Sequence, residues 1–114
     1  MDYYQIWVDI RESRRDVEFA QHVARYLGHL KEKGLIEGHM FTRRKLGFGP
    51  DALGEFNITI MVKDMAQLER TFQYVATRGP PIEPLHAAVF SMVTDFTAAL
   101  YRDFPDAVRM PAPP

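Results

Sequence analysis

The chain has 114 residues, of which 46% are hydrophobic and 25% charged, and its formal net charge at pH 7 is −1. This length fits one domain with its own core, and the composition excludes a disordered or membrane-spanning chain. Cysteine is absent, which excludes disulfides, thiolate nucleophiles and sulfur-ligated metals.

The first predicted element is a strand over residues 3–10, because alternate side chains there differ in character. One side carries Tyr4, Ile6, Val8 and Ile10, and the other carries Tyr3, Gln5, Trp7 and Asp9. A helix follows, with Ser13 as its expected N-cap and Gly34 as its left-handed C-terminal residue. Its expected core face consists of Val17, Ala20, Val23, Ala24, Leu27 and Leu30.

A second strand is expected over residues 36–46, followed by a connection rich in Gly and Pro over 47–54. The third strand, over residues 55–63, alternates as the first one does. Its apolar side carries Phe56, Ile58, Ile60 and Val62, and its other side carries Asn57, Thr59 and Met61. One face of the sheet is therefore expected to lie under helices, and the other to be open, polar and aromatic.

A second helix is expected after Asp64, which caps it together with Gln67, and it ends near Arg78 before two prolines. Another helical piece covers residues 85–94, and residues 95–102 are predicted to form the fourth strand. One long helix through residue 102 stays open as the alternative, because Ala and Leu also favour helix.

The order β-α-β-β-α-β predicts an α+β, ferredoxin-like domain, in which a four-stranded antiparallel sheet carries its helices on one face. We expect a single domain over residues 1–105 and a Pro-rich C-terminal tail over 106–114. The tail has neither a periodic apolar face nor a full set of backbone donors.

Trp7 on the open face exposes a large apolar area, which monomers seldom leave uncovered. Two such sheets facing each other would bury that area and enclose a cavity. The arrangement resembles the dimeric α+β barrel superfamily over residues 3–104, and residues 43–50, 53–56 and 99–106 are similar to strings in a small family of uncharacterised bacterial proteins. The superfamily implies a homodimer with a pocket between sheet and helices or within the barrel. Its members include cofactor-free monooxygenases, haem-degrading enzymes, isomerases and stress-response proteins.

The predicted ligand-binding residues are those that the open face brings together, namely Tyr3, Gln5, Trp7, Asn57, Met61 and Tyr101. Asn57 and Trp7 resemble in kind the Asn and Trp that some oxygenases of the superfamily place in their cavities. His39 and His86 are candidate bases, since imidazole titrates near neutral pH. Asp9 is a further candidate acid or base, although such an aspartate more often caps a turn.

Arg43, Arg44 and Lys45 form the only compact basic run and are a candidate anion site. Protection of an exposed edge strand by charge explains the run better, because charged residues at such an edge discourage the addition of another strand. The four histidines lack zinc-ligand spacing, so we predict no metal and no cofactor. The RNA-binding consensus of ferredoxin-like modules is missing, and we predict no nucleic-acid partner.

Two functions remain open at this point. The first is a homodimeric module that binds or converts a small molecule, as a monooxygenase or isomerase does, and the second is a non-catalytic oligomerising or regulatory domain. The chain begins with a strand pattern and has no apolar run near the ~20 residues that span a bilayer. We therefore expect a cytoplasmic protein with no membrane contact.

Overall fold

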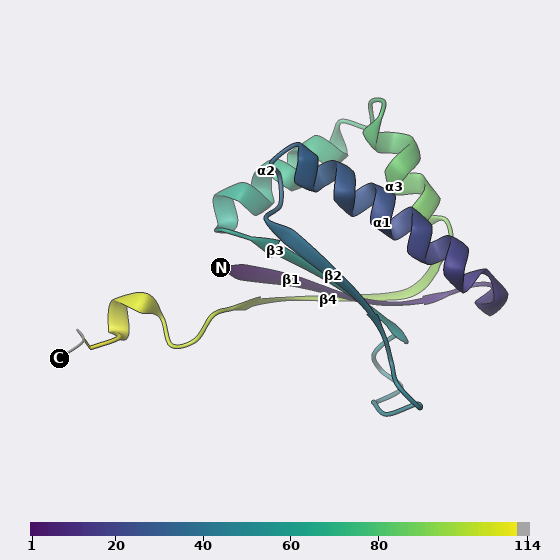
Figure 1. Ribbon diagram of the computed structural model, residues 1–114, viewed down its shortest axis with the longest axis horizontal. Coiled ribbons are helices and arrows are strands. Elements are labelled where there is room, and N and C mark those ends of the chain that lie inside the picture. The colour runs from purple at the N-terminus through teal and green to yellow at the C-terminus, as the bar shows by residue number, and fades with distance from the viewer. Residues whose placement is uncertain (112–114) are drawn as a thin grey trace.

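The computed structural model describes residues 1–111 and arranges them as one sheet with helices stacked on it (Figure 1). The main elements are β1 (Asp2–Ile10), α1 (Asp16–Glu32), β2 (Gly38–Arg43), β3 (Phe56–Val62), α2 (Met65–Ala76), α3 (Ile82–Phe90) and β4 (Val93–Arg102). Short 3-10 turns cover Ser13–Arg15 and Ala107–Arg109. Part of the predicted tail, residues 112–114, lies outside the described residues.

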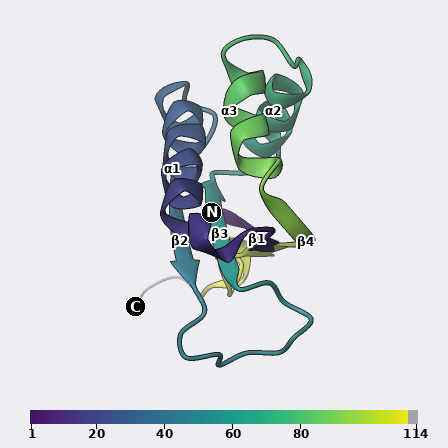
Figure 2. The same ribbon diagram turned by 90° about the vertical axis from the view of Figure 1, so that its right-hand side faces the viewer.

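The sheet is antiparallel in the order β2-β3-β1-β4, and all helices lie on one of its faces (Figures 1 and 2). The predicted ferredoxin-like fold is thus confirmed, with β1 and β3 in the centre. Residues 93–102 form a strand, so the alternative of one long helix is wrong. Asp95 has a φ of 54°, which interrupts helical geometry, and the Thr and Phe residues around it favour extended backbone.

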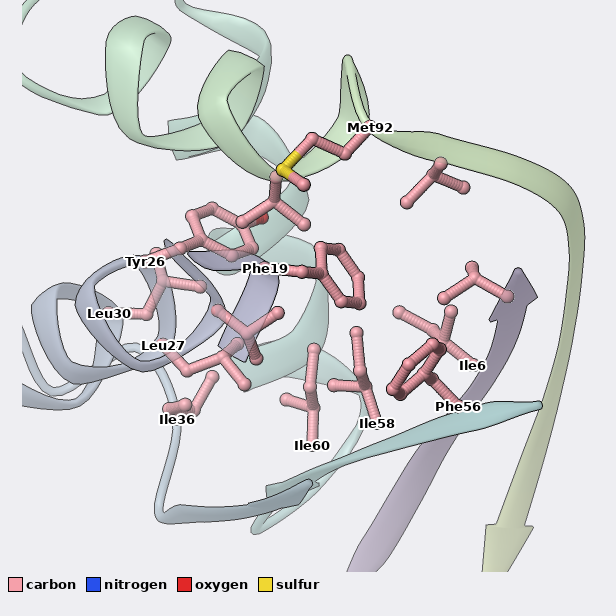
Figure 3. Packing of buried hydrophobic residues seen from close by; sticks show 14 of the residues in the cluster. Ile6, Phe19, Tyr26, Leu27, Leu30, Ile36, Phe56, Ile58, Ile60 and Met92 are labelled. Atoms are coloured by element: carbon pink, nitrogen blue, oxygen red, sulfur yellow. The ribbon is translucent and has the colours of Figure 1, made fainter. Parts of the chain in front are cut away.

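The core lies between the apolar face of the sheet and all three helices, since Leu68 of α2 and Val89 of α3 belong to it together with the buried side chains of α1. Ile6 and Val8 of β1 and Ile58 of β3 are buried, as the alternation predicts. Figure 3 shows the ring of Phe19 pointing from α1 toward the sheet, and its centroid lies 5.4 Å from that of Phe56. Burying apolar side chains between helices and sheet is the main favourable contribution to the folding free energy of such a two-layer structure.

Val23, Leu27 and Leu30 of the predicted face of α1 are buried, but the edge of that face is wrong because the helix is rotated slightly from the predicted orientation. Val17 is 68% exposed and Ala24 is also exposed, whereas Phe19 and Tyr26 are buried. Ser13 belongs to a 3-10 turn and makes no capping hydrogen bond, so the helix proper begins at Asp16. Rotating the helix in this way buries two aromatic rings, which remove more apolar area from water than Val and Ala do.

The start of α2 confirms the predicted cap. The Asp64 side chain accepts a hydrogen bond from the backbone N of Gln67 at 2.9 Å. Gln67 is only 2% exposed, and its Oε1 accepts from the backbone N of Lys63 at 2.7 Å. Its Nε2 donates to the carbonyl of Gly34 at 3.1 Å and to Glu37 Oε2 at 3.0 Å. This one side chain therefore joins α2 to the segment between α1 and β2.

Strand β2 is shorter than predicted, because the chain leaves the sheet after Arg43 and forms a long β2–β3 loop over residues 44–55. Arg44 Nη2 donates to the carbonyls of Pro50 at 3.0 Å and Leu53 at 2.6 Å, which holds the loop closed on itself. A Cβ at Gly49 would lie 2.5 Å from Arg44 Nε, so a larger residue there would displace this guanidinium from its present position. The loop projects on the side of the sheet opposite the helices (Figures 1 and 2).

Within residues 1–111, no helix is both long and apolar enough to cross a membrane.

Candidate functional site

A cavity of about 620 Å³ lies between the helices and the sheet. Its volume falls within the range of roughly 300–1,000 Å³ that is typical of small-molecule sites. The sheet contributes Tyr4, Ile6, Ile60 and Phe96, and the helices contribute mainly aliphatic and aromatic side chains. The helical layer covers the sheet in two parts, α1 on one side and α2 with α3 on the other (Figure 2).

Tyr26 of α1 presents a polar tip to this apolar cavity. The side chain is 8% exposed, and burial, with a smaller effect of Tyr4, raises its pKa to about 12. Its hydroxyl makes no hydrogen bond to any other residue of the described chain. No fully buried side-chain nitrogen or oxygen in residues 1–111 lacks a partner, so the Tyr26 oxygen keeps some accessible surface, and Tyr26 is one of the residues that line the cavity. It is an uncharged donor with unused hydrogen-bonding capacity.

Tyr4 of β1 is a second phenol on the cavity wall. Burial raises its pKa as well, so its hydroxyl is protonated at neutral pH. Its ring meets Phe72 of α2 edge-on, with the centroids 5.5 Å apart. This contact fixes the ring while leaving the hydroxyl available as a donor.

His86 of α3 is the titratable base of the cavity wall. Its ring stacks on Phe90 at 4.5 Å and meets Tyr26 edge-on at 5.7 Å. Burial lowers its pKa, Glu83 opposes that shift, and Arg78 adds to it. The imidazole is therefore neutral at pH 7 and able to accept a proton.

The charged residues that line the cavity are Arg78, which is exposed, and Glu83, which is half-buried. Thr71 has a hydroxyl on the wall, but that hydroxyl already donates to the carbonyl of Leu35 at 2.6 Å. The deep part of the cavity thus offers apolar surface, two phenols and one neutral imidazole. Such a wall favours an uncharged ligand, since burying a charge without a partner is costly.

The opposite face of the sheet is the open face of the sequence prediction, and the structure brings its six predicted ligand-binding residues together. In the sheet register, Tyr3 lies between Met61 and Tyr101, and Trp7 pairs with Asn57. Gln5 occupies the row between them. Their common face is confirmed, while their role in ligand binding stays a prediction.

Polar groups on the open face are bonded mainly to one another. Gln5 Oε1 accepts from Thr59 Oγ1 at 2.7 Å and from Asn57 Nδ2 at 3.2 Å. Asn57 Nδ2 also donates to the carbonyl of Ile6 at 3.1 Å, and Tyr3 donates to Asp103 Oδ1 at 2.6 Å. This network occupies Gln5 Oε1 and Asn57 Nδ2, so a ligand would have to compete with these contacts.

A hollow of about 230 Å³ on the open face lies under the β2–β3 loop. Trp7 and Asn57 form part of its floor, and Phe48, Pro50 and Leu53 of the loop form part of its wall. It falls below the usual size of a small-molecule site and matches a single large side chain more closely.

Neither Asp9 nor His39 is among the residues that line the two cavities. Asp9 Oδ1 accepts from the backbone N of Glu55 at 2.8 Å, which fixes the end of the β2–β3 loop. His39 pairs with Ile60 in the sheet register, and burial, with a smaller effect of Lys31, lowers its pKa. Both remain predicted catalytic residues only, and the contact of Asp9 indicates a structural role.

The basic run of the β2 edge has internal partners for two of its three cations. Arg43 pairs with Asp16 at 2.9 Å and with Glu55 at 3.0 Å, and Arg44 holds the loop carbonyls. Lys45 is exposed. An anion would have to compete with these contacts, so the anion site stays a prediction, and the edge position of β2 fits the alternative of strand protection. No group of three or more metal-binding side chains occurs among residues 1–111.

Sequence reasoning missed the combination of Tyr4, Tyr26 and His86. A usable signal was present, since Tyr4 alternates with Ile6 on the covered face and Tyr26 follows Phe19 by seven residues on one helix face. Aromatic residues with polar tips on a core face need partners. The absence of obvious partners nearby in sequence would have pointed to a cavity.

Comparison with known proteins agrees with the fold. A family model described as "Family of unknown function (DUF6614)" matches residues 1–112. No curated protein matches the chain at a significant level. Among solved structures, SnoaB, a cofactor-independent oxygenase from Streptomyces nogalater, superposes with a TM-score of 0.67 at 14% identity over 93% of this chain and 95% of that one. A dimeric protein of unknown function with a ferredoxin-like fold from Bacteroides fragilis gives 0.62 at 8% identity over 90% and 95%.

Proposed function

Because the chain belongs to the DUF6614 family, whose name specifies no activity, we propose from the geometry that it binds an uncharged aromatic small molecule in the cavity between helices and sheet. The observation that carries this proposal is the uncharged hydroxyl of Tyr26, which has no protein hydrogen-bond partner within residues 1–111 and belongs to a side chain that lines a largely apolar cavity. A ligand oxygen would satisfy that donor. The proposed site thus lies on the helix side of the sheet, opposite the face that the sequence favoured.

The same wall supports a conversion of the bound molecule. His86 accepts a proton from an acidic C–H or O–H group of the ligand, and Tyr26 and Tyr4 stabilise the oxyanion that develops. In an isomerisation the proton returns to a different carbon of the ligand. In an oxygenation the ligand itself supplies the electrons: a CH₂ group and O₂ become C=O and water. The second reaction is supported by the similarity of the fold to a cofactor-independent oxygenase.

A homodimer formed through the open faces is the assembly that fits these observations. Trp7 is half-buried on a face with no helix over it, and one structural neighbour is described as dimeric. Since the polar network of Gln5, Asn57 and Thr59 is largely satisfied internally, this face is suited to packing. The same network favours the second candidate function, a non-catalytic oligomerising domain, if the helix-side cavity binds nothing.

Ligand binding is tested by filling the cavity. Ala76 lines the cavity and is exposed at its edge, whereas Ala66 of the same helix is exposed elsewhere. We expect the uncharged aromatic probe N-phenyl-1-naphthylamine to gain fluorescence with the native protein. Ala76→Trp should weaken this binding at least about tenfold, and the matched control Ala66→Trp should leave it unchanged. Equal binding by both variants, or no binding by the native protein, contradicts the proposal.

Conversion is tested separately with 2-tetralone, an uncharged aromatic ketone with acidic C–H groups. The native protein should accelerate exchange of these hydrogens for deuterium, observed by NMR, and His86→Gln should reduce the acceleration by about a hundredfold. Probe binding without any accelerated exchange would support ligand binding and contradict the proposed catalytic activity.

A further inference from the structure

A short arm, residues 103–111, continues from β4 away from the body of the protein (Figure 1). Its apolar side chains are left in solvent: Phe104 is 78% exposed, Val108 95% and Met110 54%. Isolated exposed apolar residues are normal, but three within seven consecutive positions on a projecting segment indicate a surface that another molecule covers.

The root of the arm is held in a fixed direction. The backbone N of Asp103 donates to the carbonyl of Met1 at 3.2 Å, and the Asp103 carboxylate accepts from the Tyr3 hydroxyl. Just beyond, Arg102 pairs with Asp106 at 2.7 Å. Tyr3 belongs to the open face, so the contacts that aim the arm also join it to the proposed dimer surface.

The β2–β3 loop has the same character at the other end of the sheet. Leu46 is 82% exposed and Phe48 is 81% exposed, although Arg44 holds the loop in a defined shape. Under the loop lies the hollow of about 230 Å³ that Trp7 helps to form. The loop thus offers two uncovered apolar side chains and a recess of side-chain size on the open-face side.

Figure 1 shows the relation between these two segments: the arm leaves one end of the sheet, and the loop hangs below the other end. When two copies pack open face to open face about a two-fold axis that runs across the strands, opposite ends of the two sheets come together. The arm of each copy then lies beside the loop of the other. The contact occurs twice, as an isologous interface requires.

We propose that the arm of one protomer packs against the β2–β3 loop of a second copy and places an apolar side chain in the hollow beside Trp7. This inference rests on the proposed homodimer, which it extends from a sheet contact to an exchange of arms. A second copy is the occupant because the two uncovered apolar segments are on the same chain, at opposite ends, and on a surface continuous with the open face. The arm also covers the exposed edge of Trp7 without using the helix-side cavity.

Cross-linking tests this contact directly, because the native chain contains no cysteine. We would prepare Val108→Cys and Phe48→Cys as separate proteins, mix them and oxidise them with copper phenanthroline. A covalent dimer should form in the mixture and far less in either protein alone. The matched control mixes Val108→Cys with Val17→Cys, which is 68% exposed on α1, and should give little product. Equal cross-linking to position 17 would show random encounter and overturn the proposal.

The contribution of the arm to association is measured on the variant Phe104→Ser, Val108→Ser, Met110→Ser. Sedimentation equilibrium should show a dimer dissociation constant raised at least about tenfold, with unchanged binding of N-phenyl-1-naphthylamine. An unchanged constant together with no specific cross-link overturns the arm contact while the sheet-packed dimer stands. If the native protein is monomeric at all concentrations, both the proposed homodimer and the arm contact are wrong.

Discussion

The two faces of the sheet are built from alternate residues of the same strands, yet they use hydrogen-bonding capacity in opposite ways. On the helix side, Tyr4 and Tyr26 present hydroxyls to a cavity, and His86 adds a neutral imidazole. On the open side, Gln5 and Asn57 bond to each other and to neighbouring groups. The difference teaches that residue type alone does not mark a ligand site. Unused donors and acceptors in a space of suitable volume mark it better.

This contrast assigns different roles to the faces. The helix side supplies both the core and the proposed ligand site, because helices and sheet there leave one part filled and another part empty. The open side supplies an internally bonded surface with Trp7 on β1, one of the two central strands, and this surface is suited to a second sheet. The following variants test this division, beginning with the largest expected effect.

Removing a core aromatic from the filled part of the helix side should cost the most. Phe19 is 0% exposed, and its ring meets those of Phe41 and Phe56 edge-on. Phe19→Ala should lower the free energy of unfolding by about 3–5 kcal/mol, because it removes a buried ring and leaves a void. Urea denaturation measures the change. The control Val17→Ala, on the same helix but exposed, should change it by less than about 0.5 kcal/mol. If Val17→Ala lowered the free energy of unfolding as much as Phe19→Ala does, the result would support the predicted helix face, which placed Val17 in the core.

Trp7→Ala should separate association from folding and from ligand binding. The variant is expected to remain folded, to weaken self-association at least about tenfold, equivalent to about 1.4 kcal/mol, and to bind N-phenyl-1-naphthylamine normally. Analytical ultracentrifugation and fluorescence titration provide the two measurements. Loss of probe binding with an intact dimer would reverse the roles of the two faces and support the open-face pocket.

Acidification should have the smallest effect, and it should act on the helix side. Burial lowers the pKa of His86 in the folded protein, whereas in the unfolded chain its pKa stays near the ordinary ~6.5. Below pH ~6.5 the unfolded chain therefore binds more protons, so stability falls until the folded pKa is passed. Below that value the folded imidazole carries a charge in the cavity, and binding of the uncharged probe should weaken.

The pH prediction is checked by titrating probe affinity between about pH 5 and pH 7.5 in the native protein and in His86→Gln. The variant should lose the decrease in affinity at low pH. His39 also has a lowered pKa but lies outside the cavity. His39→Gln therefore serves as the matched control, and it should retain the decrease. An identical pH profile in native protein and His86→Gln would exclude His86 from the ligand site.

The alternation of β1 and β3 allowed the sheet, its central strands and its two faces to be predicted from sequence, because period-two patterns are local. The face of α1 was harder, since Val17 and Phe19 both fit a helical stripe and the choice depends on tertiary packing. Strand β4 was separable from helix only by its β-branched and aromatic residues, which competed with Ala and Leu.

The candidate site was only partly predictable for a different reason. His86 was identified by its residue type, but its contact with Tyr26 joins residues 60 positions apart and depends on how α1 and α3 pack. Asp9 illustrates the converse, because its hydrogen bond to the backbone of Glu55 spans 46 positions and gives this candidate acid or base a structural contact. Long-range contacts of this kind leave no local pattern in the sequence.

The buried carboxamide of Gln67 has a consequence for motion. It contacts Lys63 before α2, Gly34 after α1 and Glu37 before β2. These three connections therefore open most easily as one cooperative unit, and amide hydrogens along them should exchange with solvent at similar rates. The C-terminal end of α1, the start of β2 and the start of α2 would then open together in one local unfolding event.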